Sequence, residues 1–242
     1  MNFSEIPTAR VHSQQSLGAV DGPGLRYVVF LQGCPYHCPY CHNPDTQPLC
    51  GGDIYSVSEL ADRIERYKPY FGEQGGVTVS GGEPLLQRVF LVEFFKECHR
   101  RGISTCLDTA GLQPDERVRA VLAHTDTVLY DIKDSSNERC RDRFGIDFSI
   151  IRDFLSACDD AGCDIWVRHV VVPGMTDGKE HIRKIAALAR TAKNLKKIEL
   201  LPFRKLCSEK YAALGLPFPL ADTPECDTEL LSTLNDLLKN DV

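Results

Sequence analysis

The chain has 242 residues, which at about 150 residues per domain corresponds to one or two domains. Its 28 Lys and Arg residues against 34 Asp and Glu residues give a net charge of −6, and without a basic block this argues against binding nucleic acid through its phosphates. No apolar run approaches the ~18 residues of a membrane-spanning helix, and the polar stretch 1–13 has no hydrophobic signal segment. We therefore expect a cytoplasmic protein with no membrane or nucleic-acid partner.

Strand patterns and helix patterns alternate along the chain. Short β-branched or aromatic runs predict strands, and apolar residues at helical spacing predict the helices between them. Ser56 and Glu59 have the spacing of a capping box at the first helix. Strands are predicted at 27–31, 76–80, 104–108, 127–132, 164–172 and 197–201, and helices at 56–68, 87–101, 114–123, 147–161, 177–193 and 230–238.

Six strands separated by helices predict a parallel α/β sheet with right-handed crossovers. Eight full units take ~250 residues, whereas an open six-unit barrel and a doubly wound sheet both fit the order. Of these we expect the partial (β/α)6 TIM-like barrel, with parallel strands and open on one side. A single domain is expected over 1–242, with a core of about 20–204 and a helical C-terminal extension of about 205–242.

The residues best suited to chemistry follow the predicted strands. In parallel α/β folds, functional side chains gather where the strands end. A cysteine-rich loop follows the first strand and a glycine-rich segment the second, Asp108 and Asp131 end the third and fourth, Arg168 lies in the fifth, and Arg204 follows the sixth. We therefore predict one functional site at this edge of the sheet.

The loop after the first strand carries Cys34, Cys38 and Cys41. In a reducing compartment, closely spaced cysteines are metal ligands or catalytic groups more often than disulfides, and thiolates suit zinc, Cu(I) or iron–sulfur clusters. Three thiols leave one iron of a 4Fe–4S cluster free to bind a substrate. The alternatives are a zinc loop with a fourth ligand from Cys50 or a nearby histidine, or three thiols without a metal.

The segment 80–84, Ser-Gly-Gly-Glu-Pro, follows the second strand. Its spacing is neither that of a P-loop nor that of a dinucleotide-binding fingerprint. Two glycines allow the backbone to approach a ligand closely, and Glu83 is suited to accept a hydrogen bond from an ammonium group. A plain glycine-rich turn is the alternative here, and a helix cap or a solvated side chain is the alternative for Asp108 and Asp131.

The cysteine spacing, with Tyr40 before the last cysteine, resembles the signature of the radical S-adenosylmethionine superfamily. Within it, the chain resembles the glycyl-radical enzyme activases known as pyruvate formate-lyase activating enzymes, from about residue 11 to residue 201. The segments that carry this resemblance are 21–26 (DGPGLR), 30–34 (FLQGC), 106–111 (CLDTAG), 131–133 (DIK), 166–174 (WVRHVVVPG) and 197–203 (KIELLPF).

The resemblance implies a single 4Fe–4S cluster on Cys34, Cys38 and Cys41, whose fourth iron binds the amino and carboxylate groups of S-adenosylmethionine. It also implies contacts from other residues to this ligand, and a monovalent cation, sodium or potassium, beside the ligand's carboxylate. The implied contacts are Tyr40, His42, Gly82, Glu83, Asp131, Lys133 and Arg168; the implied cation ligands are Asp108, Thr109 and Asp131, with the Leu129 carbonyl.

The activity implied by the resemblance is reductive cleavage of S-adenosylmethionine and removal of a hydrogen from a glycine of a partner protein, which becomes a glycyl radical. The implied partner is pyruvate formate-lyase, with flavodoxin or ferredoxin as the electron donor, and Asp21 is implied to lie near the peptide substrate. We expect a monomer. A radical S-adenosylmethionine enzyme acting on a small molecule, such as a deazaguanine-ring synthase, and a zinc or electron-carrying module are the competing interpretations.

The chain departs from the family pattern at two places. Arg204 stands where the family commonly has a histidine that contacts the adenosine, and Ala110 stands where it often has asparagine. The other eight cysteines form no second cluster-like spacing, and only Cys50 lies where related activases insert a ferredoxin-like segment. We therefore expect the short type with one cluster, and we expect the scattered cysteines to be mostly buried as small apolar residues.

Overall fold

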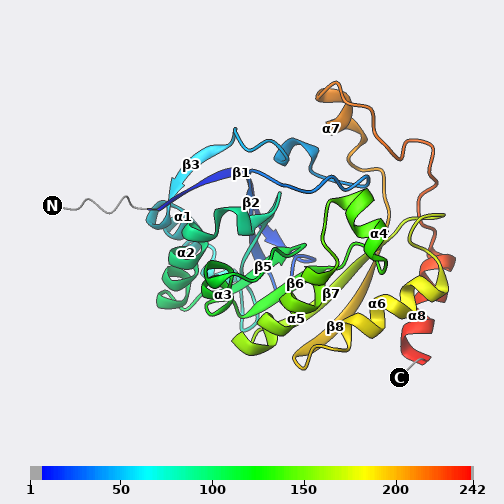
Figure 1. The fold of residues 1–242 in the computed structure, drawn as a ribbon. Coiled ribbons are helices and arrows are strands. Elements are labelled where there is room, and N and C mark those ends of the chain that lie inside the picture. The colour runs from blue at the N-terminus through cyan, green and yellow to red at the C-terminus, as the bar shows by residue number, and fades with distance from the viewer. Residues whose placement is uncertain (1–6, 241–242) are drawn as a thin grey trace.

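The computed structural model describes residues 7–240, so the first six residues of the polar N-terminal stretch lie outside the described residues. Its centre is one curved sheet of eight strands in the order β3-β1-β2-β4-β5-β6-β7-β8. Figure 1 shows this sheet with helices arranged along its outer side. Because β3 and β8 are unpaired edges rather than neighbours, the sheet does not close into a barrel.

Six neighbouring strands are parallel, which confirms the predicted partial barrel. Their order along the sheet follows their order in the chain and never reverses, as it would in a doubly wound sheet. Right-handed crossovers therefore place the connecting helices on one face. The parallel strands are β2 (Arg26–Leu31), β4 (Gly76–Gly81), β5 (Ser104–Thr109), β6 (Thr127–Asp131), β7 (Asp164–Val171) and β8 (Leu195–Pro202).

Two antiparallel strands at one edge were not predicted. The strand β1 (Thr8–Gly18) pairs with β2, and β3 (Asp53–Ser56) pairs with the other side of β1. Most β1 side chains are polar and only Ala9, Val11 and Gly18 are buried, so its sequence lacks a clear strand pattern. The sheet consequently begins well before residue 20, where the predicted core begins.

The six predicted helices are all present. They are α1 (Val57–Glu65), α2 (Arg88–Arg100), α3 (Glu116–Leu122), α5 (Ser149–Ala161), α6 (Lys179–Ala189) and α8 (Thr228–Asn240). The capping box at α1 is formed in both directions: the Glu59 N–H donates to Ser56 Oγ at 3.3 Å, and the Ser56 N–H donates to a Glu59 carboxylate oxygen at 2.8 Å. None of the described helices is long and apolar enough to cross a membrane.

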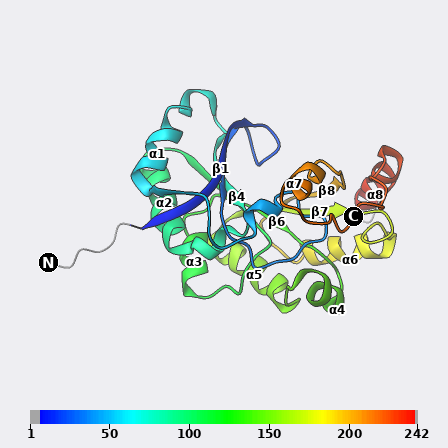
Figure 2. The same cartoon turned by 90° about the horizontal axis from the view of Figure 1, so that it is seen from above.

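Several short elements were not predicted. They are α4 (Asn137–Arg139), a π-helix (Cys140–Phe144), α7 (Ser208–Ala213), and the 3-10 turns Pro44–Thr46, Lys68–Tyr70 and Pro84–Gln87. In the C-terminal part, α8 packs on α6 and β8, whereas α7 packs on the turn Pro44–Thr46. Figure 2, seen from above, shows α7 and α8 as separate parts of this region, and a dark blue loop after β1 that projects outward.

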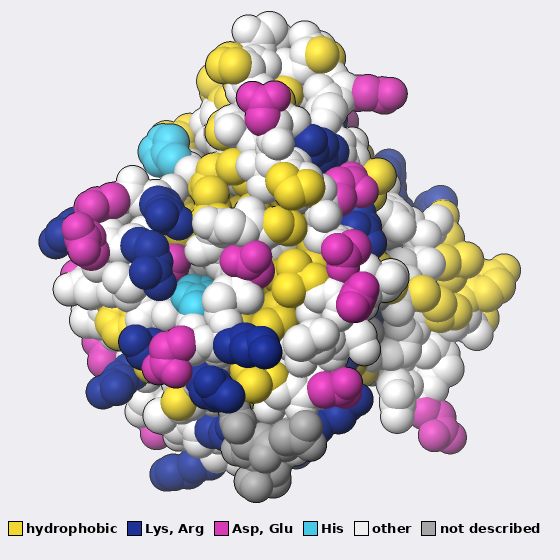
Figure 3. Space-filling model, turned by 90° about the vertical axis from the view of Figure 1, so that its right-hand side faces the viewer, with side chains coloured by type: hydrophobic (Ala, Val, Ile, Leu, Met, Phe, Trp, Pro, Cys, Tyr) yellow, Lys and Arg dark blue, Asp and Glu magenta, His cyan; other side chains and the backbone are white. Residues whose placement is uncertain are grey.

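The surface in Figure 3 has Lys and Arg side chains interspersed with Asp and Glu side chains on the face shown, with a lobe at the top where α7 lies in Figure 1. This mixture agrees with the lack of a basic block in the sequence.

The layer between the sheet and the helices is apolar. On α2, Phe90, Phe94 and Phe95 are buried, whereas Val89 on the same helix is 58% exposed. The rings of Phe90 and Phe94 stack with centroids 5.3 Å apart. This face of α2 therefore supports the strands that position the site.

Replacing Phe94 with Ala should lower the free energy of unfolding by about 3–5 kcal/mol, because the fully buried ring leaves a cavity. Urea unfolding of the two proteins measures this difference. Val89→Ala is the matched control on the same helix and should change stability by less than about 0.5 kcal/mol. Equal losses from the two variants would contradict the assignment of Phe94 to the core.

Candidate active site

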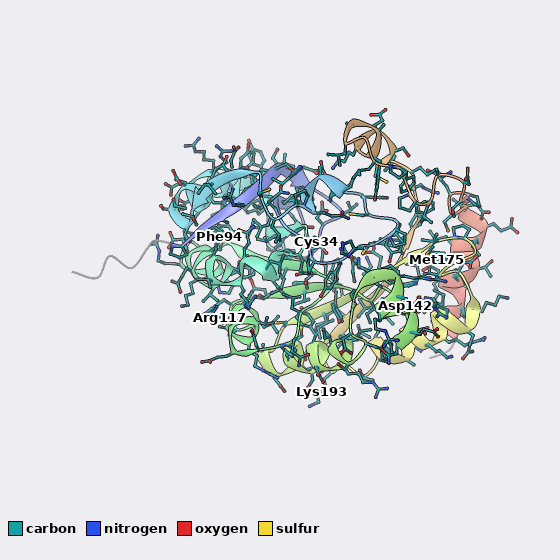
Figure 4. All side chains as sticks on the ribbon, turned by 45° about the horizontal axis from the view of Figure 1, so that its top comes forward. Cys34, Phe94, Arg117, Asp142, Met175 and Lys193 are labelled. Atoms are coloured by element: carbon teal, nitrogen blue, oxygen red, sulfur yellow. The ribbon has the colours of Figure 1, made fainter. Side chains whose placement is uncertain are left out.

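One cavity of about 300 Å³ lies at the carboxyl ends of the parallel strands. Figure 4 shows Cys34 near the middle of the molecule, well away from Phe94 on α2. Thirteen residues that the sequence assigned to a site role line this cavity: Asp21, Cys34, Cys38, Tyr40, Cys41, His42, Gly82, Glu83, Asp108, Thr109, Asp131, Lys133 and Arg168. Leu129, whose carbonyl was implied as a cation ligand, is not among the lining residues. The fold thus brings together residues that are as far as 147 positions apart in the sequence, from Asp21 to Arg168.

The cysteine loop is held by backbone hydrogen bonds. After β2, the Gly33 N–H donates to the Thr46 carbonyl at 2.7 Å and the Cys34 N–H donates to the Gln47 carbonyl at 3.1 Å, so the loop folds back on the segment that follows it. The three thiols face one cavity and are partly exposed. Burial raises the pKa of Cys34 to about 12 and that of Cys38 to about 11, and it also raises the pKa of Cys41.

Three thiols around one cavity fit an iron–sulfur cluster better than zinc. Within residues 7–240, no three His, Cys, Asp or Glu side chains converge closely enough to hold a single metal ion. A four-iron cluster is broader than one ion, so its thiolate ligands stand farther apart. Cys50, the proposed fourth zinc ligand, is exposed and does not line the cavity. The donor set therefore fits a cluster with three protein ligands.

The glycine-rich segment 80–84 at the end of β4, here termed the strap, packs against the cysteine loop. A Cβ atom at Gly82 would overlap the carbonyl oxygen of Gly33, so only glycine allows this approach. The next residue, Glu83, donates its N–H to the same carbonyl at 2.8 Å. The glycines of the strap thus join two loops and leave backbone facing the cavity.

The Glu83 carboxylate is buried and hydrogen-bonded within the protein. It accepts hydrogen bonds from Thr109 Oγ1 at 2.6 Å, the Ala110 N–H at 3.0 Å and the Leu85 N–H at 3.1 Å. Burial raises its pKa to about 7, although these three donors act in the opposite direction. Glu83 therefore fixes the end of β5 against the strap as well as facing the cavity.

Arg168 bridges two carboxylates on neighbouring strands. Its Nε lies 3.0 Å from Asp131 Oδ1, and its Nη2 donates to Asp108 Oδ1. Lys133 Nζ lies 3.0 Å from the second Asp131 oxygen, and Ser80 Oγ donates to the second Asp108 oxygen at 2.6 Å. Asp108 and Asp131 are thus neither helix caps nor solvated side chains.

These charges determine one another's protonation. Burial alone would raise the pKa of Asp131, but Arg168 and Lys133 hold it well below its usual range. Burial would lower the pKa of Lys133, whereas Asp131 and the thiol of Cys38 raise it well above its usual value. Asp131 and the two cations Lys133 and Arg168 therefore remain charged at neutral pH, and the cavity can bind a zwitterionic ligand through both signs of charge.

Asp21 reaches the same cavity from the loop between β1 and β2. Its carboxylate lies against Gly18, since a Cβ atom at Gly18 would overlap Asp21 Oδ2. Burial raises the pKa of Asp21, and Asp108 raises it further. The loop therefore holds a carboxylate inside the curve of the sheet.

Arg204 does not line the cavity. Its guanidinium donates to the Cys226 carbonyl and lies 3.8 Å from Glu225, so the side chain turns toward the C-terminal segment. Its backbone carbonyl lies 3.0 Å from His42 Nε2. The side chain at this position thus lies outside the cavity, while its backbone gives His42 a fixed partner.

Several lining residues were missed by the sequence reasoning. Tyr36, in the cysteine loop, donates its hydroxyl to the Gly111 carbonyl. Apolar side chains at the ends of β7 and β8 also line the cavity, namely Val170, Leu201 and Pro202. Their positions at strand ends could have predicted that they line the cavity, whereas their apolar side chains gave no indication of a site role.

The prediction for the remaining cysteines agrees with the structure. Of the eight outside the cysteine triplet, seven are buried and only Cys50 is exposed. Cys140, Cys158 and Cys163 are among the fully buried residues of the core. These thiols therefore act as small apolar side chains.

Known proteins resemble this chain over most of its length. Residues 28–189 match a family model described as the radical SAM superfamily. A pyruvate formate-lyase-activating enzyme of Clostridium pasteurianum is 45% identical over 236 residues, covering 95% of this chain and 97% of that protein. One of Staphylococcus aureus is 41% identical over 227 residues, covering 90% of each chain.

Solved structures share the fold. The crystal structure of Streptococcus suis SuiB bound to precursor peptide SuiA has a TM-score of 0.65 at 14% identity, covering 90% of this chain and 46% of that chain. A domain of pyruvate-formate lyase-activating enzyme from Bacteroides vulgatus has a TM-score of 0.56 at 21% identity, covering 69% of this chain and 94% of that chain. At these identities the likeness concerns the fold alone.

The raised pKa values predict slow alkylation of the cavity thiols in protein freed of metal. At pH 8, a thiol of pKa 11 is ionised to only about one part in a thousand. Iodoacetamide should therefore modify exposed Cys50 at least ten times faster than Cys34 or Cys38, as measured by peptide mass spectrometry under anaerobic conditions. Cys158 is the buried control. Modification of Cys38 as fast as that of Cys50 would contradict the prediction.

Replacing Arg168 with Met should lower the free energy of unfolding by about 3 kcal/mol, because Asp108 and Asp131 then lose their shared cation in a largely buried place. Denaturant unfolding of cluster-free protein measures this loss. Lys96→Met is the control: its ion pair with Glu93 is exposed and is worth less than about 1 kcal/mol. Equal losses would show that the Arg168 bridge is no stronger than a surface pair.

Proposed function

Because the chain belongs to the radical S-adenosylmethionine superfamily and to its pyruvate formate-lyase-activating enzymes, we propose that it activates pyruvate formate-lyase by producing a glycyl radical on that protein. The observation that carries this proposal is the convergence of thirteen predicted site residues on one cavity at the strand ends. The 45% identity over nearly the whole chain supports the choice of partner.

Cys34, Cys38 and Cys41 would hold one 4Fe–4S cluster. Their thiols line the cavity, and thiolate is the ligand that such clusters take. Because burial keeps these thiols protonated, cluster binding must release their protons and is favoured by higher pH.

S-adenosylmethionine would occupy the rest of the cavity. The backbone at Gly82 and the carboxylate of Glu83 would receive its amino group, and Lys133 and Arg168 would supply positive charge for its carboxylate; all four residues line the cavity. Tyr40, His42 and Asp131 complete the proposed set of contacts; the buried Tyr40 hydroxyl has no hydrogen-bond partner within the described residues and is available to a ligand or water.

When bound, the cluster would supply the one electron for reductive cleavage of S-adenosylmethionine to methionine and 5′-deoxyadenosine, the latter taking its hydrogen atom from the glycine α-carbon of the partner, which would become the glycyl radical. The residues of this chain bind and orient the two substrates. No side chain has to act as an acid or a base, which agrees with a cavity whose charges are held by ion pairs.

A monovalent cation, sodium or potassium, is a further part of the proposal. Oxygen donors suit such hard cations. Asp108, Thr109 and Asp131 line the cavity, and the Leu129 carbonyl belongs to the same strand as Asp131. The two carboxylates are joined through Arg168, so a cation would share them with that guanidinium.

The partner's glycine segment would enter through the open side of the sheet and meet Asp21. The loop that carries Asp21 also carries Val20, which is 82% exposed, and Leu17 near the end of β1 is exposed as well. Apolar side chains beside a site carboxylate suit contact with a protein substrate. Flavodoxin or ferredoxin is the proposed electron donor, and a monomer the proposed state.

An anaerobic EPR experiment tests the function. The protein is reconstituted with iron and sulfide, reduced, and mixed with S-adenosylmethionine and the host's pyruvate formate-lyase. A glycyl-radical doublet that depends on every component is expected. A cluster signal that S-adenosylmethionine perturbs, with no glycyl radical, would keep the superfamily chemistry but reject this substrate in favour of a small molecule. Bound zinc without a cluster signal would reject both.

The ligand assignment predicts a contrast between two cysteine variants. Cys38→Ala should abolish cluster binding and cleavage of S-adenosylmethionine, because only two thiolates remain in the cavity. Cys158→Ala, a buried cysteine of the core, should leave iron content and cleavage within about twofold of the wild type. Iron and sulfide analysis, together with chromatography of 5′-deoxyadenosine, measures both. Equal losses would overturn the assignment.

A further inference from the structure

Arg26, the first residue of β2, is completely buried and uses all five of its N–H groups. Its Nε donates to Thr78 Oγ1 at 3.1 Å. One terminal nitrogen donates to the carbonyls of Pro23 and Gln74 at 3.3 and 3.2 Å, and the other to those of Val77 and Ser104, the latter at 3.2 Å. This one side chain thus joins β2, β4, β5 and two loops.

None of these five acceptors is a carboxylate. Arg168, in contrast, is neutralised by Asp108 and Asp131. Burial lowers the pKa of Arg26 from its usual value, yet a guanidinium stays charged in proteins. A buried charge without an ionic partner is costly. An arginine at this position therefore points to a task that needs all five N–H donors of a guanidinium.

The Arg26 guanidinium holds residues 21–24, here termed the floor loop, through hydrogen bonds. Thr78 Oγ1, which accepts from Arg26, donates in turn to the Asp21 carbonyl at 2.6 Å, and the Pro23 carbonyl accepts directly from Arg26. Gly22 has a φ of +128°, and a Cβ atom there would lie 3.1 Å from Cys106 Sγ. The floor loop is therefore pressed into the curve of the sheet and fixed at both Asp21 and Pro23.

We propose that Arg26 and Thr78 are positioning residues that hold the floor loop so that the Asp21 carboxylate stays in the cavity and aligns the glycine-bearing segment of the partner. This inference rests on the proposed function. Neither Arg26 nor Thr78 lines the cavity. Their effect therefore falls on hydrogen transfer from the partner's glycine, and much less on cleavage of S-adenosylmethionine.

Thr78→Val and Thr78→Ser form the decisive pair. Valine has nearly the shape of threonine but lacks the hydroxyl, which breaks the link from Arg26 to the Asp21 carbonyl, whereas serine keeps it. Thr125→Val is the matched control, because it removes another buried threonine hydroxyl, bonded to the Val121 carbonyl at 2.9 Å and remote from the floor loop.

Two readouts are made on reconstituted protein. Hydrogen exchange of the peptide 19–25 reports the floor loop, and glycyl radicals formed per 5′-deoxyadenosine report the alignment of the substrate. Thr78→Val should exchange at least tenfold faster and lose at least tenfold in radicals per 5′-deoxyadenosine, with cleavage itself changed less than threefold and a raised KM for the partner. Thr78→Ser and Thr125→Val should stay within twofold in each measurement.

Arg26→Lys extends the test, because an ammonium has three donors and cannot serve five acceptors. The same losses are expected, at least as large as in Thr78→Val; should this variant fail to fold, the threonine pair still decides. A Thr78→Val protein that matches Thr78→Ser in both readouts overturns the positioning role. Wild-type protein that forms no glycyl radical instead overturns the proposed function, so the two failures are distinct.

Discussion

The close approach of the Gly82 backbone to the Gly33 carbonyl is the contact on which the site depends. It brings the strap after β4 against the cysteine loop after β2, with no side chain between them. The hydrogen bond from Glu83 N–H to the same carbonyl, at 2.8 Å, fixes the distance, and the Glu83 carboxylate then holds the end of β5 through Thr109. Three strand ends are therefore joined in one frame beside the three thiols.

The interior uses two arginines in different ways. Arg168 lies between Asp108 and Asp131, so its charge is balanced and the cavity keeps both signs of charge for a zwitterionic ligand. Arg26 meets only carbonyl and hydroxyl oxygens and serves the backbone of the floor loop. One guanidinium thus organises the ligand side of the cavity and the other supports the loop below it. This difference in role follows from the acceptors around each guanidinium, which are carboxylates for Arg168 and neutral oxygens for Arg26.

The parallel strands and the longer helices could be predicted because each is specified by its own residues. The apolar run at β2 and the apolar residues spaced three and four positions apart in α2 are local patterns. The strands β1 and β3 could not be predicted in this way. Most residues of β1 are polar, and it is a strand because it pairs with β2 on one side and β3 on the other. Such pairing is a non-local interaction that periodicity does not encode.

The sequence by itself determined which groups meet. The cysteine spacing supplied the donors, and because parallel strands end at one edge, the residues after each strand had to gather there. The tertiary structure alone decided what each group does within the site: Arg168 bridges two carboxylates, Glu83 accepts hydrogen bonds from three internal donors, and the Arg204 side chain turns away to the Cys226 carbonyl. These choices depend on the directions of side chains from distant strands, which the packing of the whole sheet fixes.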